Sequence, residues 1–457
     1  MALMPVTDSM FLLAESREHP MHVGGLQLFE LPEDAGPDYV SDFHRELLEL
    51  ADVRELFRHR PRFPVGTVGQ FAWANDDQLD IEYHVRHSGL PRPGRVRELL
   101  ELVSRLHGTL LDRHRPMWEF TVIEGLQGNR FATYSKIHHA LLDGVSALRL
   151  LQSSLSTDPA ERGVRPPWSP RVRDNVFDKP RRSEDVDPFT AAGRLVKDVF
   201  GLGSAAAKVV NEAFREQSAT LAFQAPKSMF NVPITGARRF AAQGWPLERI
   251  KAVGRAAGAT MNDVMLAMCA GALRRYMLDL GTLPDRPLVA AVPMSLRART
   301  GESSLGGNAI GLILCNMATD EADAAARLTT IHESMLKGKA IYHGMSRLQI
   351  TALSAIPLIP LAIGTIPGLT TITPPGFNVL ISNVPGPREP LYWNGARMQG
   401  VYPLSIPYEG QALNITVTSY ADSLEFGLTG CRRTVPHLQR LLALLEESLQ
   451  ELEKATA

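Results

Sequence analysis

The sequence predicts an α/β protein with two lobes of similar plan, each a mixed sheet backed by helices. The chain has 457 residues, which is more than one hydrophobic core of ordinary size can hold. Strand-like and helix-like stretches alternate on both sides of a segment rich in proline and charge. We therefore expect an N-terminal lobe over residues 1–157, a linker with a connecting helix over residues 158–236, and a C-terminal lobe over residues 237–457.

Apolar periodicity predicts the elements of the first lobe. Helices are indicated where apolar residues recur every three or four positions, and strands where they alternate. Asp38 or Ser41 can cap the first of these helices. In chain order we expect a strand (Met21–Leu31), a helix (Tyr39–Leu50), two short strands (Gln70–Pro91, around the turn formers Asn75–Asp77), a helix (Arg95–Asp112) and a hairpin (Met117–Ala140, turning at Gly125–Asn129).

Between the lobes, residues 158–188 are too rich in proline and charge to fold alone, so we expect them to run over the surface or to be mobile. A helix is expected over Thr190–Phe214. In the second lobe, Thr260 and Asp263 have the spacing of a capping box, which places Asn262 in the first turn of a helix. The other elements expected are strands (Arg286–Arg297, Phe377–Pro387), a hairpin turning at Ala421–Ser423 (Ala412–Cys431) and a closing helix (His437–Ala455).

Composition excludes several classes of protein. The formal net charge is −1, whereas capture of nucleic acid needs a basic excess. Three cysteines, far apart and odd in number, form neither a disulfide framework nor a zinc pattern, which favours a reducing compartment. Asp8 and Glu15 precede any long apolar run, so we expect no secretory signal and a cytoplasmic location.

Two adjacent histidines, His138 and His139, precede an aspartate–glycine pair. If residues 131–139 form a strand, these two side chains point to opposite faces, and one site uses only one of them directly. A helix is expected next, with Asp143 as its cap. Gly144 would allow a close backbone approach or unusual torsion angles at the turn.

The histidines alone leave three interpretations open. Metal binding is disfavoured, because ligands at adjacent strand positions diverge and no partner lies at the spacing of HExxH. A purely structural pair at a strand end is an alternative. A general base needs a neutral imidazole, which histidine supplies because its ordinary pKa is about 6.5, and a buried aspartate could give the turn rigidity.

The spacing HHxxxDG, present as His138, His139, Asp143 and Gly144, is the signature of the CoA-dependent acyltransferase superfamily, which includes chloramphenicol acetyltransferase and peptide-synthetase condensation domains. From end to end the chain resembles the bacterial wax ester synthase/acyl-CoA:diacylglycerol acyltransferase family. The segments that carry this resemblance are MHVGGL (Met21–Leu26), YHVRHSGLPRPG (Tyr83–Gly94), LLDRHRPMWE (Leu110–Glu119), MNDVMLA (Met261–Ala267), VPMSLR (Val292–Arg297), ISNVPGP (Ile381–Pro387) and ALNITVTSYADSLEFGLTGCR (Ala412–Arg432), with departures at Met117 and Gln411.

The resemblance implies a chloramphenicol acetyltransferase-like fold with an active-site tunnel between the lobes. It implies acyl-CoA as a co-substrate, a long-chain alcohol or diacylglycerol as the acceptor, and neither a cofactor nor a metal. His139 would take the hydroxyl proton as the oxygen attacks the thioester carbonyl, without an acyl-enzyme, and such a base contributes about 10²–10⁴-fold. His138 would support it, and Asp143 would brace the loop through an expected ion pair with Arg297.

Three residues of the second lobe are expected to complete the site. Asn262, in the first turn of its helix, is our candidate donor to the oxyanion, although it could equally only help to cap that helix. Ser382 and Asn383 are expected to line the lobe interface, with a purely structural strand end as the alternative.

The segment Leu348–Pro387 has no charged side chain, but prolines and glycines interrupt it too often for a single spanning helix. It could be buried core, line an acyl pocket, or touch a lipid surface. We therefore expect peripheral association with the inner membrane or with lipid inclusions.

Two other functions remain as alternatives. One is a condensation-type acyltransferase that uses a carrier-protein donor, which the segments outside HHxxxDG disfavour. The other is a lipid-binding or droplet-coat protein without activity, which the intact His139 and Asp143 disfavour.

Overall fold

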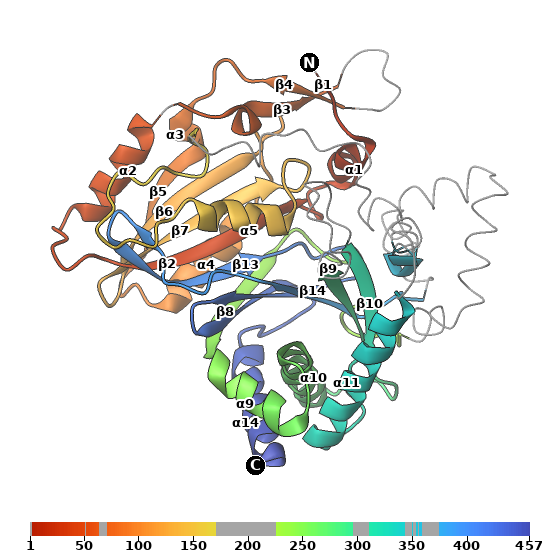
Figure 1. Ribbon diagram of the computed structural model, residues 1–457. Coiled ribbons are helices and arrows are strands. Elements are labelled where there is room, and N and C mark those ends of the chain that lie inside the picture. The colour runs from red at the N-terminus through yellow and green to blue at the C-terminus, as the bar shows by residue number, and fades with distance from the viewer. Residues whose placement is uncertain are drawn as a thin grey trace.

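The computed structural model describes residues 2–50, 52–63, 71–170, 225–295, 310–342, 350, 353–354, 356–358 and 374–457. The described chain forms two lobes, one above the other in Figure 1, with the N-terminal end in the upper lobe and the C-terminus at the far end of the lower lobe. Each lobe has a mixed six-stranded sheet, which confirms the predicted α/β class.

The sheet of the first lobe has the order β12-β13-β2-β7-β6-β5, and only β5 and β6 run parallel. A separate sheet of order β1-β4-β3 lies at the N-terminal end. The strands are β1 (Ala2–Leu3), β2 (His22–Glu30), β3 (His59–Arg62), β4 (Ala72–Asn75), β5 (Val85–Gly89), β6 (Trp118–Leu126), β7 (Arg130–His138), β12 (Tyr392–Trp393) and β13 (Ala396–Leu404).

Helices cover both faces of the first sheet. Side chains that alternate along β2 and β7 point to opposite faces and pack in two different hydrophobic clusters. Phe131 and Ile137 of β7 pack in a cluster that includes residues of α1, α2 and α5, whereas Ala132 and Tyr134 pack with residues of α4. The helices are α1 (Val6–Ala14), α2 (Tyr39–Glu49), α3 (Ile81–His84), α4 (Val96–His107), α5 (Gly144–Ser153) and the 3₁₀ helix η1 (Glu55–Arg58).

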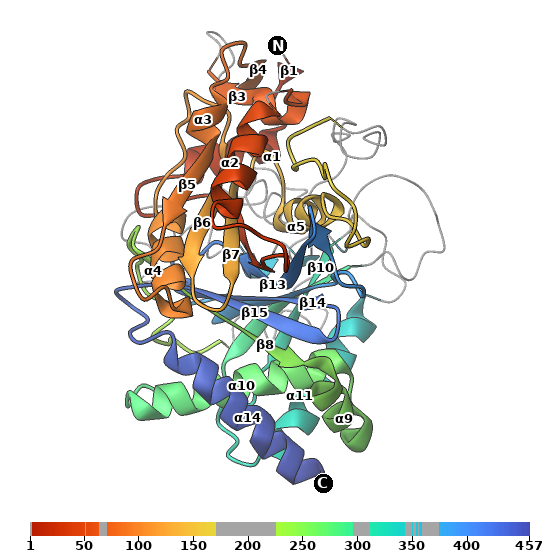
Figure 2. The ribbon, with the colours of Figure 1, turned by 90° about the vertical axis from the view of Figure 1, so that its left-hand side faces the viewer.

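The sheet of the second lobe has the order β10-β9-β11-β14-β15-β8 and contains two parallel pairs, β9 with β11 and β11 with β14. Figure 2 shows its main helices together on the side of this sheet that faces away from the first lobe. The elements are β8 (Arg238–Pro246), α9 (Leu247–Ala257), α10 (Met261–Asp279), β9 (Val289–Ser295), β10 (Ile310–Asn316), α11 (Ala324–Ile341), η3 (Ile356–Leu358), β11 (Val379–Val384), β14 (Leu413–Tyr420), β15 (Ser423–Cys431) and α14 (Arg440–Thr456).

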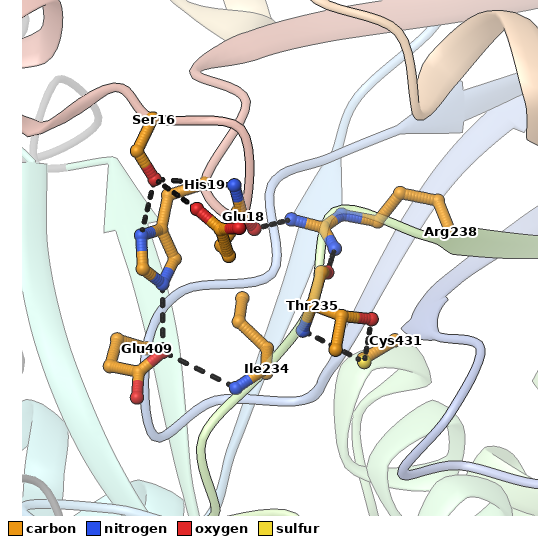
Figure 3. A network of polar contacts seen from close by, with 8 residues as sticks. All are labelled: Ser16, Glu18, His19, Ile234, Thr235, Arg238, Glu409 and Cys431. Atoms are coloured by element: carbon orange, nitrogen blue, oxygen red, sulfur yellow. Dashed lines mark hydrogen bonds and ion pairs between the residues drawn. The ribbon is translucent and has the colours of Figure 1, made fainter.

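The lobes share strands and side-chain contacts. Strands β12 and β13 come from the range that the sequence placed in the C-terminal lobe, yet β13 pairs along its length with β2 of the first sheet. A polar network also joins the lobes (Figure 3), in which His19 Nε2 lies 2.7 Å from Glu409 Oε2 and Arg238 donates to the carbonyl oxygen of Glu18 at 2.9 Å. The loop that follows α1 is thus tied to the second lobe.

The structure confirms the elements predicted within the described residues and adds others. The hairpins β6–β7 and β14–β15 turn where expected, and α2, α4, α10 and α14 match the predicted helices. The two strands expected over Gln70–Pro91 are β4 and β5, but they belong to different sheets and the short helix α3 separates them. The helix expected over Thr190–Phe214 lies outside the described residues.

Described residues of two segments are buried, although a surface position was expected for the first and a buried position was one of the alternatives for the second. Trp168, near the start of the expected linker, is buried in the first-lobe core and stacks on Trp118 with ring centroids 5.3 Å apart. The charged neighbours Glu161, Arg162 and Arg165 stay exposed, so the large indole ring can be buried without burying their charges. Within the apolar segment Leu348–Pro387, Ile350, Ser354 and Leu358 are buried, and residues 359–373 lie outside the described part of the chain.

Candidate active site

The two histidines lie where β7 ends and turns into α5. His138 is the last residue of β7 and pairs with His22 of β2, which brings Met21 opposite His139. The backbone N–H of His139 donates to the carbonyl oxygen of Met21 at 2.8 Å. The turn closes on His138, whose carbonyl oxygen accepts from the N–H of Leu141 at 2.9 Å. The strand register therefore fixes the backbone of both histidines.

His138 is fully buried and has polar neighbours at both ring nitrogens. Its Nδ1 accepts from the backbone N–H of Ala140 at 3.1 Å. Its Nε2 lies 3.3 Å from Oε2 of Glu15, and the side chains of both residues are at most 1% exposed. Because Nδ1 is an acceptor, the ring proton of neutral His138 sits on Nε2, the nitrogen that lies nearest to the carboxylate.

His139 has a different environment, as the strand alternation predicted. Its side chain is partly exposed, and its ring stacks on Phe11 of α1 with centroids 4.2 Å apart and planes 27° apart. Phe11 itself is buried. One face of the imidazole therefore rests on an apolar ring, and its Nδ1 is buried, while the residue as a whole keeps some solvent-accessible surface.

Asp143 is the N-cap of α5, as predicted. Its Oδ1 accepts from the backbone N–H of Ser146 at 2.7 Å, and its Oδ2 accepts from the hydroxyl of the same serine at 3.0 Å. The expected ion-pair partner Arg297 lies outside the described residues. The carboxylate therefore starts the helix that immediately follows the histidine turn, which satisfies an otherwise unpaired helix donor.

Gly144 is the first residue of α5. Its φ is not positive, so the unusual torsion angle suggested for it is not observed. A Cβ at this position would lie 3.6 Å from Cγ1 of Val23, which is an ordinary contact. The described structure thus shows neither the close backbone approach nor the unusual torsion angles suggested for Gly144, and this suggestion is corrected.

The second lobe contributes a pair of asparagines. The predicted capping box of α10 is present, with Thr260 and Asp263 bonded in both directions at 3.3 and 2.9 Å, so Asn262 lies in the first turn. Nδ2 of Asn383 on β11 donates to Oδ1 of Asn262 at 3.4 Å. Ser382 precedes Asn383 in the strand, so its side chain points to the other face and does not join this pair.

The end of β11 reaches the lobe that carries the histidines. Val384, next to Asn383, is buried in the same hydrophobic cluster as Leu141 and Leu142 of the histidine turn. Adjacent β14 supports this end, since the hydroxyl of Thr418 donates to the carbonyl oxygen of Val384 at 2.9 Å. The asparagine pair is therefore held at the inter-lobe end of the second sheet.

Sequence reasoning missed three residues around the turn: Phe11 on His139, Glu15 beside His138, and Arg113, which lies 3.0 Å from Oε1 of Glu15. Glu15 had been noted only as a charge that interrupts an apolar run. Burial alone would raise the pKa of Glu15, but His138, the Met21 amide and Arg113 outweigh burial and lower this pKa. The local sequence holds no signal for these contacts, because they join segments about a hundred residues apart.

These groups can perform proton transfer and hold developing negative charge. An imidazole can serve as a general base, and amide N–H groups near a helix start favour an oxyanion. Among the described residues, no three or more His, Cys, Asp or Glu side chains are grouped so that they could hold a metal ion. In the same part of the chain no single helix has the length and apolar character to cross a membrane, although α9 and α10 together, bent by 101°, meet those criteria.

Comparisons with known proteins agree along the whole chain. A family model described as the wax ester synthase/diacylglycerol acyltransferase catalytic domain matches residues 3–265, and the C-terminal domain of the same family matches residues 306–453. The Mycobacterium tuberculosis protein named probable diacyglycerol O-acyltransferase tgs2 is 53% identical over 458 residues, which cover 100% of this chain and 99% of that protein.

Solved structures show the same fold. The wax ester synthase/diacylglycerol acyltransferase from Marinobacter aquaeolei VT8 superposes with a TM-score of 0.83 at 43% identity, with 100% of both chains covered. The first condensation domain of the calcium-dependent antibiotic synthetase superposes with a TM-score of 0.60 at 17% identity, covering 100% of this chain and 96% of that one. The second likeness bears on the fold alone and confirms the predicted two-lobed architecture.

Proposed function

The chain belongs to the wax ester synthase/diacylglycerol acyltransferase family and is an O-acyltransferase, and on this premise we propose that it moves a fatty acyl group from acyl-CoA to a long-chain alcohol or a diacylglycerol. The observation that carries the proposal is the turn after β7. There a partly exposed His139 stands next to a fully buried His138, and Asp143 caps the helix that follows.

His139 acts as the general base. Its imidazole takes the proton of the acceptor hydroxyl while that oxygen attacks the thioester carbonyl carbon, which gives a tetrahedral oxyanion. Collapse of this intermediate breaks the carbon–sulfur bond, and the proton held by the imidazole passes to the departing CoA thiolate. The ester and free CoA leave, and no cofactor or metal is required. Positioning both substrates together adds to the effect of the base.

Asn262 supplies a donor to the oxyanion. Because its Oδ1 accepts from Asn383, the amide group that remains to donate is Nδ2. The first turn of α10 adds the positive end of a helix dipole at the same place. Asn383 thus orients Asn262, which gives the ISNVPGP segment a role at the interface of the lobes.

Substrates with long acyl chains need an apolar surface along the route by which they reach the active site. We propose that both enter between the lobes and that the protein rests peripherally on a membrane or lipid inclusion. Support comes from exposed apolar side chains at the N-terminal end of the first lobe, on β1, on α1 and after β3: Leu3, Met10, Leu13 and Phe63. Such a group lowers its free energy when lipid covers it.

The test uses the full chain with palmitoyl-CoA and a thiol reagent that measures released CoA. We expect release to require an acceptor, either hexadecanol or dipalmitoylglycerol, and the ratio of the two rates gives the acceptor preference. His139→Ala should lower kcat by about 10²–10⁴-fold, the contribution of a general base. A variant with near-normal turnover would place the base elsewhere.

Two outcomes would replace the proposal itself. CoA release that no acceptor stimulates would favour a lipid-binding protein. Transfer that occurs from an acylated carrier protein but not from acyl-CoA would favour a condensation-type donor.

A further inference from the structure

The carboxylate of Glu15 is a buried anion that contacts a guanidinium, a backbone N–H and an imidazole nitrogen. Glu15 directly follows α1, and its side chain is 1% exposed. Its Oε1 lies 3.0 Å from the Arg113 guanidinium, while Oε2 accepts from the backbone N–H of Met21 at 3.2 Å and lies 3.3 Å from His138 Nε2. A buried carboxylate is stable only with such partners, so its geometry is tightly determined.

These contacts fix the ring of His138. The Ala140 N–H occupies Nδ1 and the Glu15 carboxylate faces Nε2, so rotation or tautomer exchange of the ring would break both contacts. The hydrogen bond from the Ala140 N–H to the ring spans His139 in the chain. The position of the His138 ring therefore constrains the backbone on both sides of the base.

The same short segment supports His139 directly. Phe11 of α1 stacks on its ring, and the carbonyl oxygen of Met21 accepts its N–H. Glu15 lies between these two contacts in the chain and anchors the segment from inside the lobe. We infer that Glu15 is a positioning residue for the transfer reaction, acting on His139 through His138; this inference rests on the proposed function.

Loss of the Glu15 carboxylate should lower kcat and leave substrate binding largely intact. Misplacement of a catalytic group by about 1 Å costs on the order of 10²-fold in rate. We expect Glu15→Met, which has similar length and no acceptor oxygen, to lower kcat about 10- to 100-fold. Glu15→Gln keeps one acceptor oxygen and should lose less. The KM for palmitoyl-CoA should stay within about twofold, because Glu15 acts on the base rather than on substrate.

The chain offers a closely matched control in Glu119 of β6. Its buried carboxylate lies 3.0 Å from Arg86 and 2.9 Å from Lys136, so it also bridges an arginine and a second basic side chain. We expect Glu119→Met to lower the thermal unfolding midpoint as much as Glu15→Met does, with a far smaller loss of kcat. Equal losses of kcat in the two variants would overturn the inference, because they would reflect general destabilisation.

A double-mutant cycle tests the route through His138. If Glu15 acts only on that ring, kcat of the pair Glu15→Gln/His138→Gln should equal kcat of His138→Gln alone. Effects that multiply in the double variant, or an unchanged kcat in Glu15→Gln, would refute the inference.

A readout independent of turnover separates this inference from the proposed function. In protein labelled with ¹⁵N-histidine, the imidazole signal that disappears in His138→Gln should report an Nε2–H ring in the wild type and should shift in Glu15→Gln. An unchanged signal refutes the positioning role even if the wild type transfers no acyl group. Absence of acceptor-dependent CoA release in the wild type, with the signal shifted, refutes the proposed function instead.

Discussion

The chemistry of the histidine turn depends on how differently its residues are placed. His138 is enclosed between a backbone amide and a carboxylate, whereas His139 keeps some exposed surface and rests on an aromatic ring. The environments of these adjacent residues differ because successive side chains of a strand point to opposite faces of the sheet. A buried, oriented histidine beside an accessible one provides rigidity and proton transfer in two consecutive residues.

Asp143 is expected to act mainly as a helix cap. Asp143→Ala removes the acceptor for the Ser146 N–H and should lower the free energy of unfolding by about 1 kcal/mol. Asp143→Asn keeps a capping oxygen and should cost only a few tenths of that. Urea unfolding of both variants measures the difference. An asparagine variant as unstable as the alanine variant would show that the charge matters more than the cap, as an ion pair with Arg297 would require.

At the scale of elements, local periodicity was sufficient where an element carries its own apolar pattern. Helix α4 and hairpin β14–β15 have such patterns and were predicted. Strand β13 was not, because Gly400, Pro403 and a register shift after Met398 interrupt its alternation. HHxxxDG could be found because its spacing is local, whereas Glu15 meets His138 only through the tertiary fold.

Helix α10 allows its stabilising and catalytic residues to be separated. Thr260 belongs to the capping box, while within the described part of the chain the side chain of Asn262 is hydrogen-bonded to Asn383. Asn262→Ala should therefore lower kcat by about 10²–10³-fold, the cost of one oxyanion donor, with little change in stability. Thr260→Ala should show the reverse, a loss of about 1 kcal/mol in unfolding free energy.

Steady-state kinetics and urea unfolding on both variants measure the two effects. If Asn262→Ala is as active as the wild type, the residue serves only its helix, and the oxyanion donor lies elsewhere.

At the scale of the whole molecule, the lobes are interlocked. Strand β13 belongs to the first sheet, although it follows most strands of the second sheet in the chain. Conversely, the loop after α1 in the first lobe contacts Glu409 of the second lobe (Figure 3). Pairings between residues almost 400 positions apart leave no pattern in a single sequence, which explains why the two lobes were predicted and the crossover was not. The site therefore depends on the joint stability of both lobes.

The inter-lobe contact between Tyr402 and Glu425 should make that stability depend on pH. Tyr402 belongs to β13 of the first sheet and Glu425 to β15 of the second, and the tyrosine side chain interacts with the carboxyl group so as to lower its pKa. Burial raises the pKa of Glu425 from its ordinary 4.5 to about 7. Between these values the unfolded chain releases a proton that the folded chain keeps, so stability falls as pH rises and is lowest above about pH 7.

The variant Glu425→Gln has no ionisable group at this position, so its free energy of unfolding should not fall with pH in this way. Because one pKa unit corresponds to about 1.4 kcal/mol, the variant should gain roughly 3 kcal/mol over the wild type at pH 8 and little at pH 4.5. Urea unfolding of both proteins across this range measures the gain. Tyr402→Phe removes the hydroxyl that lowers the pKa of Glu425 and should extend the loss to higher pH. Parallel stability curves for wild type and Glu425→Gln would mean that the carboxylate is already ionised, and hydrated, between the lobes.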